Sequence, residues 1–130
     1  IGTAGSLMGV SRALRAAGQE TLVIALEPSS SPILTAGTTG GHNVEGIGLG
    51  FVPELLDADF YDEARTVDES EARRIALRLA REEGVFVGTS SGMNVAGAIE
   101  LAKELGPEKT VVAIACDTGL KYLSEGLFSQ

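Results

Sequence analysis

The sequence predicts an α/β fold in which a parallel sheet carries crossover helices on both faces, in three layers. Amphipathic segments alternate with short apolar runs along the 130 residues, as is typical of parallel strands joined by helices. Aromatic residues make up only 5% of the chain and tryptophan is absent, which suits a core of small aliphatic side chains. Glycine-rich segments adjoin the predicted strands, and ligands of such folds bind at the carboxyl ends of the strands.

The first helix is predicted over residues 6–17. Leu7, Val10 and Leu14 recur at helical spacing and define one apolar face, and Gly18 is placed to end the helix.

Apolar runs predict strands at residues 21–26, 85–87 and 110–115, and residues 64–67 are expected to add a short strand. Between the first two strands, residues 27–50 contain prolines, serines, threonines and many glycines without a clear period. A connection of that length inside a compact domain is usually functional.

The second helix is predicted from Asp68 to Gly84. Glu71 follows Asp68 at capping-box spacing, and Ala72 opens an apolar series that repeats every three or four residues. The arginines of this segment point away from the series, so we expect them to form a solvated face.

The third helix is predicted over residues 92–105, and Gly106-Pro107 ends it. Residues 117–119 then predict a turn, and residues 122–128 a short helix or coil. The positions expected to face inward from the third helix are Val95, Ala98, Ile99 and Ala102.

Composition excludes several classes of function. The formal net charge is −8 and no basic cluster occurs, which argues against nucleic acid as a partner. No apolar run approaches the roughly 18 residues that a membrane span needs. Cys116 stands alone and cannot form an internal disulfide, which fits a reducing, cytoplasmic setting. Ile1 looks like the end of a strand already under way, so we expect the chain to be a piece of a longer protein.

Two junctions between a strand and a helix are candidate anion sites. Residues 88–94 (GTSSGMN) and 2–6 (GTAGS) each combine glycines with hydroxyls at the start of a helix. A helix start offers unpaired backbone N–H groups and the positive end of the helix dipole. The glycines of residues 2–6 allow close backbone approach to an anion, although an ordinary turn with a serine cap explains this loop equally well.

The two serines of the second junction have separate interpretations. Helix capping explains one of Ser90 and Ser91 well. The other hydroxyl is available to a ligand heteroatom.

Three further positions are weaker candidates. Residues 46–51 (GIGLGF) could lie against a flat ligand or form a flexible connection. His42 has no cysteine or carboxylate at metal-ligand spacing, so a metal site is not expected. Cys116 ends an apolar strand and is expected to be a packed small residue rather than a nucleophile.

Together these motifs resemble the cysteine synthases, or O-acetylserine sulfhydrylases, of the fold-type-II pyridoxal phosphate enzymes. The resemblance extends from Ile1 to about Phe128 and corresponds to the C-terminal part of that family. The motifs that carry it are GTAGSLMGVSRAL, EPSSSPIL, HNVEGIGLGFVP, EEGVFVGTSSGMNVAGA and DTGLKYLS. The resemblance implies a single α/β unit, residues 1–130, that forms part of the fold-type-II domain.

The resemblance also implies roles for particular residues. Ser90 matches the family serine that hydrogen-bonds the pyridine nitrogen of pyridoxal 5'-phosphate. A hydroxyl there does not keep the nitrogen protonated as a carboxylate does, so the ring is a weaker electron sink and favours β-elimination. The phosphate would be cradled by Gly2, Thr3, Ala4, Gly5 and Ser6, and the pocket would be lined by Gly46, Ile47 and Gly48.

Three substitutions depart from the family pattern, and Ser6 in place of threonine is a mild one. Ala4 replaces a glycine, and it is strained if that position needs a positive φ. Met93 replaces the usual alanine and enlarges a side chain near the pocket.

Neither the family's Schiff-base lysine motif nor its substrate-carboxylate loop occurs in this chain. Both belong to the N-terminal, lysine-bearing part of the family. We therefore expect no catalytic residue here and no internal aldimine formed by this chain alone.

The implied reaction converts O-acetylserine and sulfide to cysteine and acetate through an aminoacrylate. A cystathionine β-synthase or a serine/threonine dehydratase-like lyase is the alternative within the same chemistry. A non-catalytic α/β module that binds a phosphorylated ligand is the alternative outside it. The resemblance further implies a homodimer and a possible complex with the C-terminal tail of serine acetyltransferase.

Overall fold

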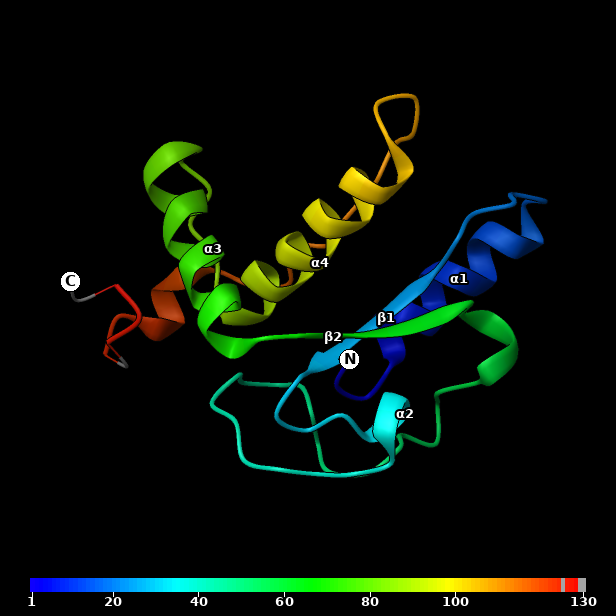
Figure 1. The fold of residues 1–130 in the computed structure, drawn as a ribbon, viewed down its shortest axis with the longest axis horizontal. Helices are drawn as coiled ribbons and strands as arrows, with labels where there is room; N and C mark the ends of the chain where they lie inside the picture. The colour runs from blue at the N-terminus through cyan, green and yellow to red at the C-terminus, as the bar shows by residue number, and fades with distance from the viewer. Residues whose placement is uncertain (125, 129–130) are drawn as a thin grey trace. The chain divides into compact units, whose positions relative to one another are not determined.

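The computed structural model describes residues 1–124 and 126–128. These residues group into two compact units (Figure 1). The first unit comprises residues 1–42 and 46–66, and the second comprises residues 43–45 and the described residues from Val67 onward.

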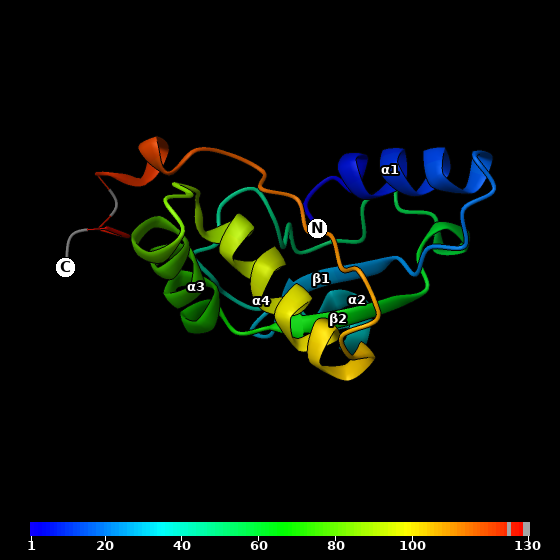
Figure 2. The same cartoon turned by 90° about the horizontal axis from the view of Figure 1, so that it is seen from above.

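The first unit is built around a pair of neighbouring strands, β1 (Ile24–Pro28) and β2 (Glu63–Val67). The strands run in the same direction, which confirms the α/β class and the parallel pairing (Figure 1). Helix α1 (Gly5–Ala16) lies along one face of the pair (Figure 2). The short helices α2 (Ile33–Ala36) and η1 (Ala58–Phe60) belong to the connection between the strands.

Helix α1 begins and ends within a residue of its predicted bounds, and Gly18 adopts the expected left-handed φ of 70°. Its buried face differs from the prediction, because Met8 and Ser11 are the buried residues and Val10 is 47% exposed. Both buried side chains contact the η1 segment: Ser11 donates to the carbonyl of Phe60, and the Met8 sulfur accepts from a backbone N–H 3.4 Å away. The packing partner, rather than hydrophobic spacing, sets this face.

The second unit contains helices α3 (Glu69–Glu82) and α4 (Thr89–Leu105) and the short helix η2 (Gly119–Tyr122). Asp68 caps α3 as predicted, and its carboxylate accepts from the Ser70 N–H at 2.8 Å. The predicted inward residues Ala72, Ile75 and Ala76 are buried.

Helices α3 and α4 touch backbone to backbone at Gly92. A Cβ added there would lie 2.1 Å from the Ala72 carbonyl oxygen. Met93 and Ala96 are buried beside this contact, whereas Ile99 is 37% exposed. The inward face predicted for the third helix was therefore wrong, because a glycine governs which side of α4 approaches α3. Met93, expected near a pocket, is 1% exposed and is part of the core.

The predicted strands at residues 85–87 and 110–115 do not form ladders in the part of the chain that the structure describes. Val87 makes one antiparallel bridge with Thr118, and Val112 is 85% exposed. A strand is held by backbone hydrogen bonds to a neighbouring strand, and among the described residues no strand pairs with residues 110–115. Both segments have the apolar residues typical of a strand, but such residues form a strand only where a second strand pairs with them.

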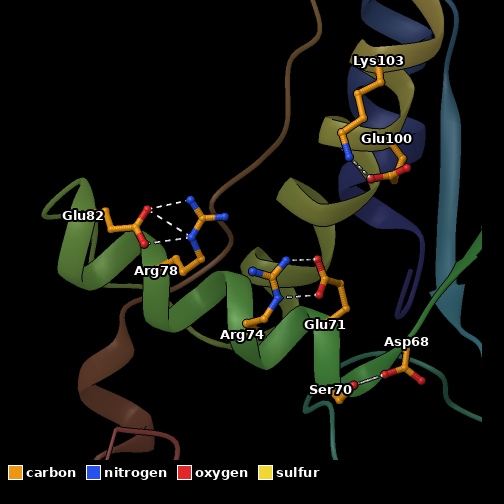
Figure 3. Close-up of polar contacts among 8 residues, drawn as sticks. All are labelled: Asp68, Ser70, Glu71, Arg74, Arg78, Glu82, Glu100 and Lys103. Carbon is orange, nitrogen blue, oxygen red and sulfur yellow. Dashed lines mark hydrogen bonds and ion pairs between the residues drawn. The ribbon is translucent and has the colours of Figure 1, made fainter.

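The outward face of α3 is a series of local ion pairs (Figure 3). Arg74 contacts Glu71 at 2.6 Å, and Arg78 contacts Glu82 at 2.7 Å. These pairs are solvent-exposed and each contributes little to stability. Arg73, Arg74 and Arg78 engage carboxylates of their own helix, which agrees with the predicted solvated face. Among the described residues, no helix combines the length and hydropathy needed to cross a membrane.

We expect Gly92→Ala to destabilise the second unit by about 1–3 kcal/mol, because the new methyl group would collide with the backbone of α3. Gly9→Ala is the matched control, since a Cβ at this position of α1 meets nothing within 4 Å. This control should gain about 0.5–1 kcal/mol from the higher helix propensity of alanine. Chemical denaturation measures both values, and equal effects of the two substitutions would contradict the packing argument.

Acid is expected to weaken the second unit. The Asn43 backbone N–H at 2.9 Å, followed by Arg73, holds the pKa of Glu69 below its ordinary value of 4.5. A carboxyl with a lowered pKa in the folded state stabilises the fold above its unfolded pKa, and this contribution is lost as the pH falls through the folded value. The midpoint of thermal unfolding should therefore decrease below about pH 4.5.

Glu69→Gln should reduce this acid sensitivity, because the variant has no carboxyl to protonate at that position. The control is Glu108→Gln, which alters an exposed residue and should keep the pH dependence of the parent. Parallel pH profiles for parent and Glu69→Gln would refute the assignment.

Candidate functional site

The loop at residues 2–6 leads into the N-terminus of α1. Ala4 is the N-cap residue, with φ 64° and ψ 2°, and it is 4% exposed. Among the described residues it is the one non-glycine residue with a positive φ, so the strain anticipated for alanine at this position is present.

The first backbone bond of α1 runs from the Met8 N–H to the Ala4 carbonyl, at 2.9 Å. The N–H groups of Gly5, Ser6 and Leu7 precede it and have no acceptor within the helix. Together with the helix dipole they can bind an anion.

Residues 46–48 lie directly against this loop. The Gly48 N–H donates to the Ile1 carbonyl at 3.1 Å. A Cβ on Gly2 would stand 2.1 Å from the Gly46 carbonyl oxygen, so the two backbones touch where no side chain intervenes. The first unit therefore brings together two groups of predicted site residues, 2–6 and 46–48.

His42 supports the same segment from within the first unit. Its Nε2 lies 2.9 Å from the Gly48 carbonyl oxygen, and because a carbonyl only accepts, Nε2 carries the proton in this contact. Gly48 has φ 58°, and a Cβ there would meet the imidazole ring at 2.2 Å. His42 thus holds a backbone position, and among the described residues no cluster of metal-ligating side chains is found.

Glu27 is a residue whose role the sequence did not suggest. Its side chain lies at the end of β1 and is 1% exposed. The carboxylate accepts from the N–H groups of Leu34 and Thr35 at 2.8 Å and from the Thr35 hydroxyl at 2.7 Å. It therefore caps α2 and fixes the start of the long connection that carries residues 46–48. The sequence does show a glutamate between a predicted strand and the turn SSSP. The order of residues does not show that the Glu27 side chain is buried.

Ser90 occupies the second position of α4, after the N-cap residue Gly88. The Ser91 hydroxyl accepts from the Cys116 N–H at 2.9 Å, so this serine anchors a neighbouring segment. Neither serine is the N-cap residue, so helix capping is not the role of either. Within the described residues the Ser90 hydroxyl has no hydrogen-bond partner, although the residue is only 9% exposed.

Ser90 belongs to the second unit, and residues 2–6 and 46–48 belong to the first. Their joint contact with one ligand stays a prediction.

Cys116, expected to be packed, is exposed, and its sulfur lies 3.3 Å from the Asn94 side-chain nitrogen. It follows an extended segment that has no strand beside it among the described residues, which explains the exposure.

Comparison with known proteins identifies the family. A model of the family described as pyridoxal-phosphate dependent enzyme matches residues 1–117. The chain belongs to this family. This confirms the pyridoxal phosphate family that the motifs indicated.

The chain is similar to individual cysteine, O-ureido-L-serine and cystathionine synthases. A cysteine synthase of Staphylococcus aureus (strain Mu50 / ATCC 700699) is 40% identical over 129 residues, which are 99% of this chain and 42% of that protein. The crystal structure of an O-ureido-L-serine synthase matches at 45% identity and a TM-score of 0.91, over 99% of this chain and 41% of that one. An O-acetylserine dependent cystathionine β-synthase from Helicobacter pylori matches at 34% identity and a TM-score of 0.85, over 98% of this chain and 42% of that one.

The chain therefore spans about two fifths of the length of these relatives. The high TM-scores over nearly all of this chain show that it has the fold of the corresponding part of those enzymes.

We expect Gly2→Ala to destabilise the first unit by about 1–3 kcal/mol, because the methyl group would force the loop away from Gly46. Gly41→Ala is the control, since a Cβ at that position meets nothing within 4 Å. Thermal denaturation of the two variants measures the difference, and a stable Gly2→Ala protein would show that the loops can separate freely.

Proposed function

We propose that this chain provides the phosphate and ring-nitrogen contacts of a pyridoxal-phosphate dependent cysteine synthase, which forms cysteine and acetate from O-acetylserine and sulfide. The observation that carries the proposal is the backbone contact of Gly2 with Gly46 at the open N-terminus of α1. The similarity to the cysteine synthase of Staphylococcus aureus supports the choice of reaction.

The residues of the first unit fit a phosphate group. The N–H groups at the start of α1 point along the helix axis and are available to acceptors, and Thr3 and Ser6 can add hydroxyl donors. Gly46 and Gly48 bring backbone without side chains against residues 1–2, and Ile47 between these glycines is the apolar residue that we assign to the pocket. We assign phosphate binding to residues 2–6 and pocket lining to residues 46–48.

The Ser90 hydroxyl fits the ring nitrogen, because the residue is only 9% exposed and its hydroxyl makes no hydrogen bond among the described residues. Bound pyridoxal phosphate supplies the electron sink for β-elimination and replacement. The protein's contribution at Ser90 is a neutral hydrogen bond that orients the ring without fixing a positive charge on its nitrogen.

We further propose that the chain is the C-terminal part of the enzyme and that the Schiff-base lysine is carried by the N-terminal part. The functional protein would be a cytoplasmic homodimer, with the serine acetyltransferase tail as a possible partner. The share of 42% of the Staphylococcus aureus cysteine synthase that the chain covers is consistent with a fragment of a larger catalytic protein.

A second candidate function is cystathionine β-synthase activity, in which a thiol amino acid replaces sulfide. The similarity to the Helicobacter pylori O-acetylserine dependent enzyme favours it over a dehydratase. Assaying the protein that carries this chain with O-acetylserine and either sulfide or homocysteine distinguishes the two reactions. Reversible cofactor binding with no turnover of either pair would favour the non-catalytic module.

We expect Ser90→Ala and Ser91→Ala to have different consequences. Ser90→Ala should retain the cofactor and lower turnover by about fivefold to tenfold, the equivalent of one hydrogen bond. Ser91→Ala should lower thermal stability, because the Cys116 N–H loses its acceptor. Steady-state kinetics and thermal denaturation of both variants test this, and unchanged turnover in Ser90→Ala would remove the serine from the site.

A further inference from the structure

The segment of residues 114–122, named the clasp, contacts the chain on both sides of Ser90. Before the helix, the Gly119 N–H donates to the Phe86 carbonyl at 3.0 Å, and Thr118 bridges Val87. After Ser90, the Cys116 N–H donates to the Ser91 hydroxyl, and the Asn94 side-chain amide donates to the Ile114 carbonyl at 2.9 Å. The start of α4 is therefore enclosed by one continuous segment.

Within the clasp, Tyr122 holds Asp117. The Tyr122 hydroxyl donates to Asp117 Oδ2 at 2.6 Å, and the tyrosine is 4% exposed. The Lys121 ammonium lies 3.7 Å from the same oxygen but is itself largely exposed, so the buried hydroxyl is the stronger constraint on the carboxylate.

The Tyr122 ring and the Asp117 carboxylate press on Gly88, the N-cap residue of α4. A Cβ on Gly88 would lie 2.3 Å from a ring carbon and 2.7 Å from Asp117 Oδ1. A side chain at this position would therefore displace one of the two groups. The turn that sets the direction of Ser90, two residues later, is thus packed against Tyr122 and Asp117.

Asp117 Oδ1 is buried and makes no hydrogen bond within the described part of the chain. Burying a carboxylate oxygen without a hydrogen-bond partner costs free energy of folding. The positive, N-terminal end of the α4 dipole reduces that cost. The position of the carboxylate therefore depends mainly on the Tyr122 hydroxyl, which holds its other oxygen.

We propose that Tyr122 is a positioning residue that acts through Asp117 and Gly88 to hold the Ser90 hydroxyl toward the ring nitrogen of the cofactor. This inference rests on the proposed function of Ser90. Removing the Tyr122 hydroxyl releases the carboxylate, loosens the turn at Gly88 and weakens the contact that Ser90 makes.

The test uses the complete holoenzyme that carries this chain, loaded with pyridoxal phosphate labelled with ¹⁵N in its ring. Tyr122→Phe should move the ring-nitrogen resonance in the same direction as Ser90→Ala and lower cofactor affinity by about fivefold, the loss of one hydrogen bond. Tyr61→Phe is the matched control, because it removes a hydroxyl from the first unit, and it should leave both values unchanged.

Variants of Asp117 separate positioning from simple stability. Asp117→Asn keeps an oxygen that can accept from Tyr122, so its resonance should stay close to that of the parent. Asp117→Ala removes the acceptor and should reproduce Tyr122→Phe. The pair also keeps the inference testable if Tyr122→Phe fails to fold.

The outcomes distinguish the two proposals. A resonance that moves in Ser90→Ala but not in Tyr122→Phe or Asp117→Ala overturns the positioning role, even if those variants melt earlier. A holoenzyme whose resonance is unchanged in Ser90→Ala, or a parent protein that binds no cofactor, contradicts the proposed function itself and removes the basis of the positioning role.

Discussion

The approach of the Gly2 backbone to the Gly46 carbonyl is the constraint on which the candidate site of the first unit depends. No Cβ fits into this contact, because it would lie 2.1 Å from the carbonyl oxygen. The bond from the Gly48 N–H to Ile1 and the support from His42 fix the same two segments. Residues far apart in sequence are thereby held against one another before the start of α1.

The same physical device recurs in the second unit. Gly92 lets α4 lie on α3, and Gly88 lets Tyr122 and Asp117 pack against the turn before Ser90. In each case, an absent side chain allows backbone or a buried polar group to approach closely. Each glycine loses more conformational entropy on folding than another residue would. The close contacts that these glycines allow offset that loss, because they hold helices and extended segments in place.

Several features followed from local pattern. The bounds of α1, the Asp68 cap, the buried stripe of α3 and the solvated arginines were predicted, because each depends on residues within a few positions of one another. The buried faces of α1 and α4 were predicted incorrectly. Met8 and Ser11 are buried against η1, and Gly92 directs α4 toward α3, so these faces depend on partners far away in sequence.

The sequence by itself determined the family and the α/β class, and it singled out the glycine and serine residues proposed to contact a cofactor, since these depend on motifs that chain order preserves. Only the tertiary structure decided that residues 46–48 lie on Gly2 and that the buried Glu27 caps α2. It also decided that Ser91 anchors a neighbouring segment, while the Ser90 hydroxyl lacks a hydrogen-bond partner among the described residues. Hydrogen bonding and close packing act through space, and a one-dimensional pattern does not specify which distant groups share that space.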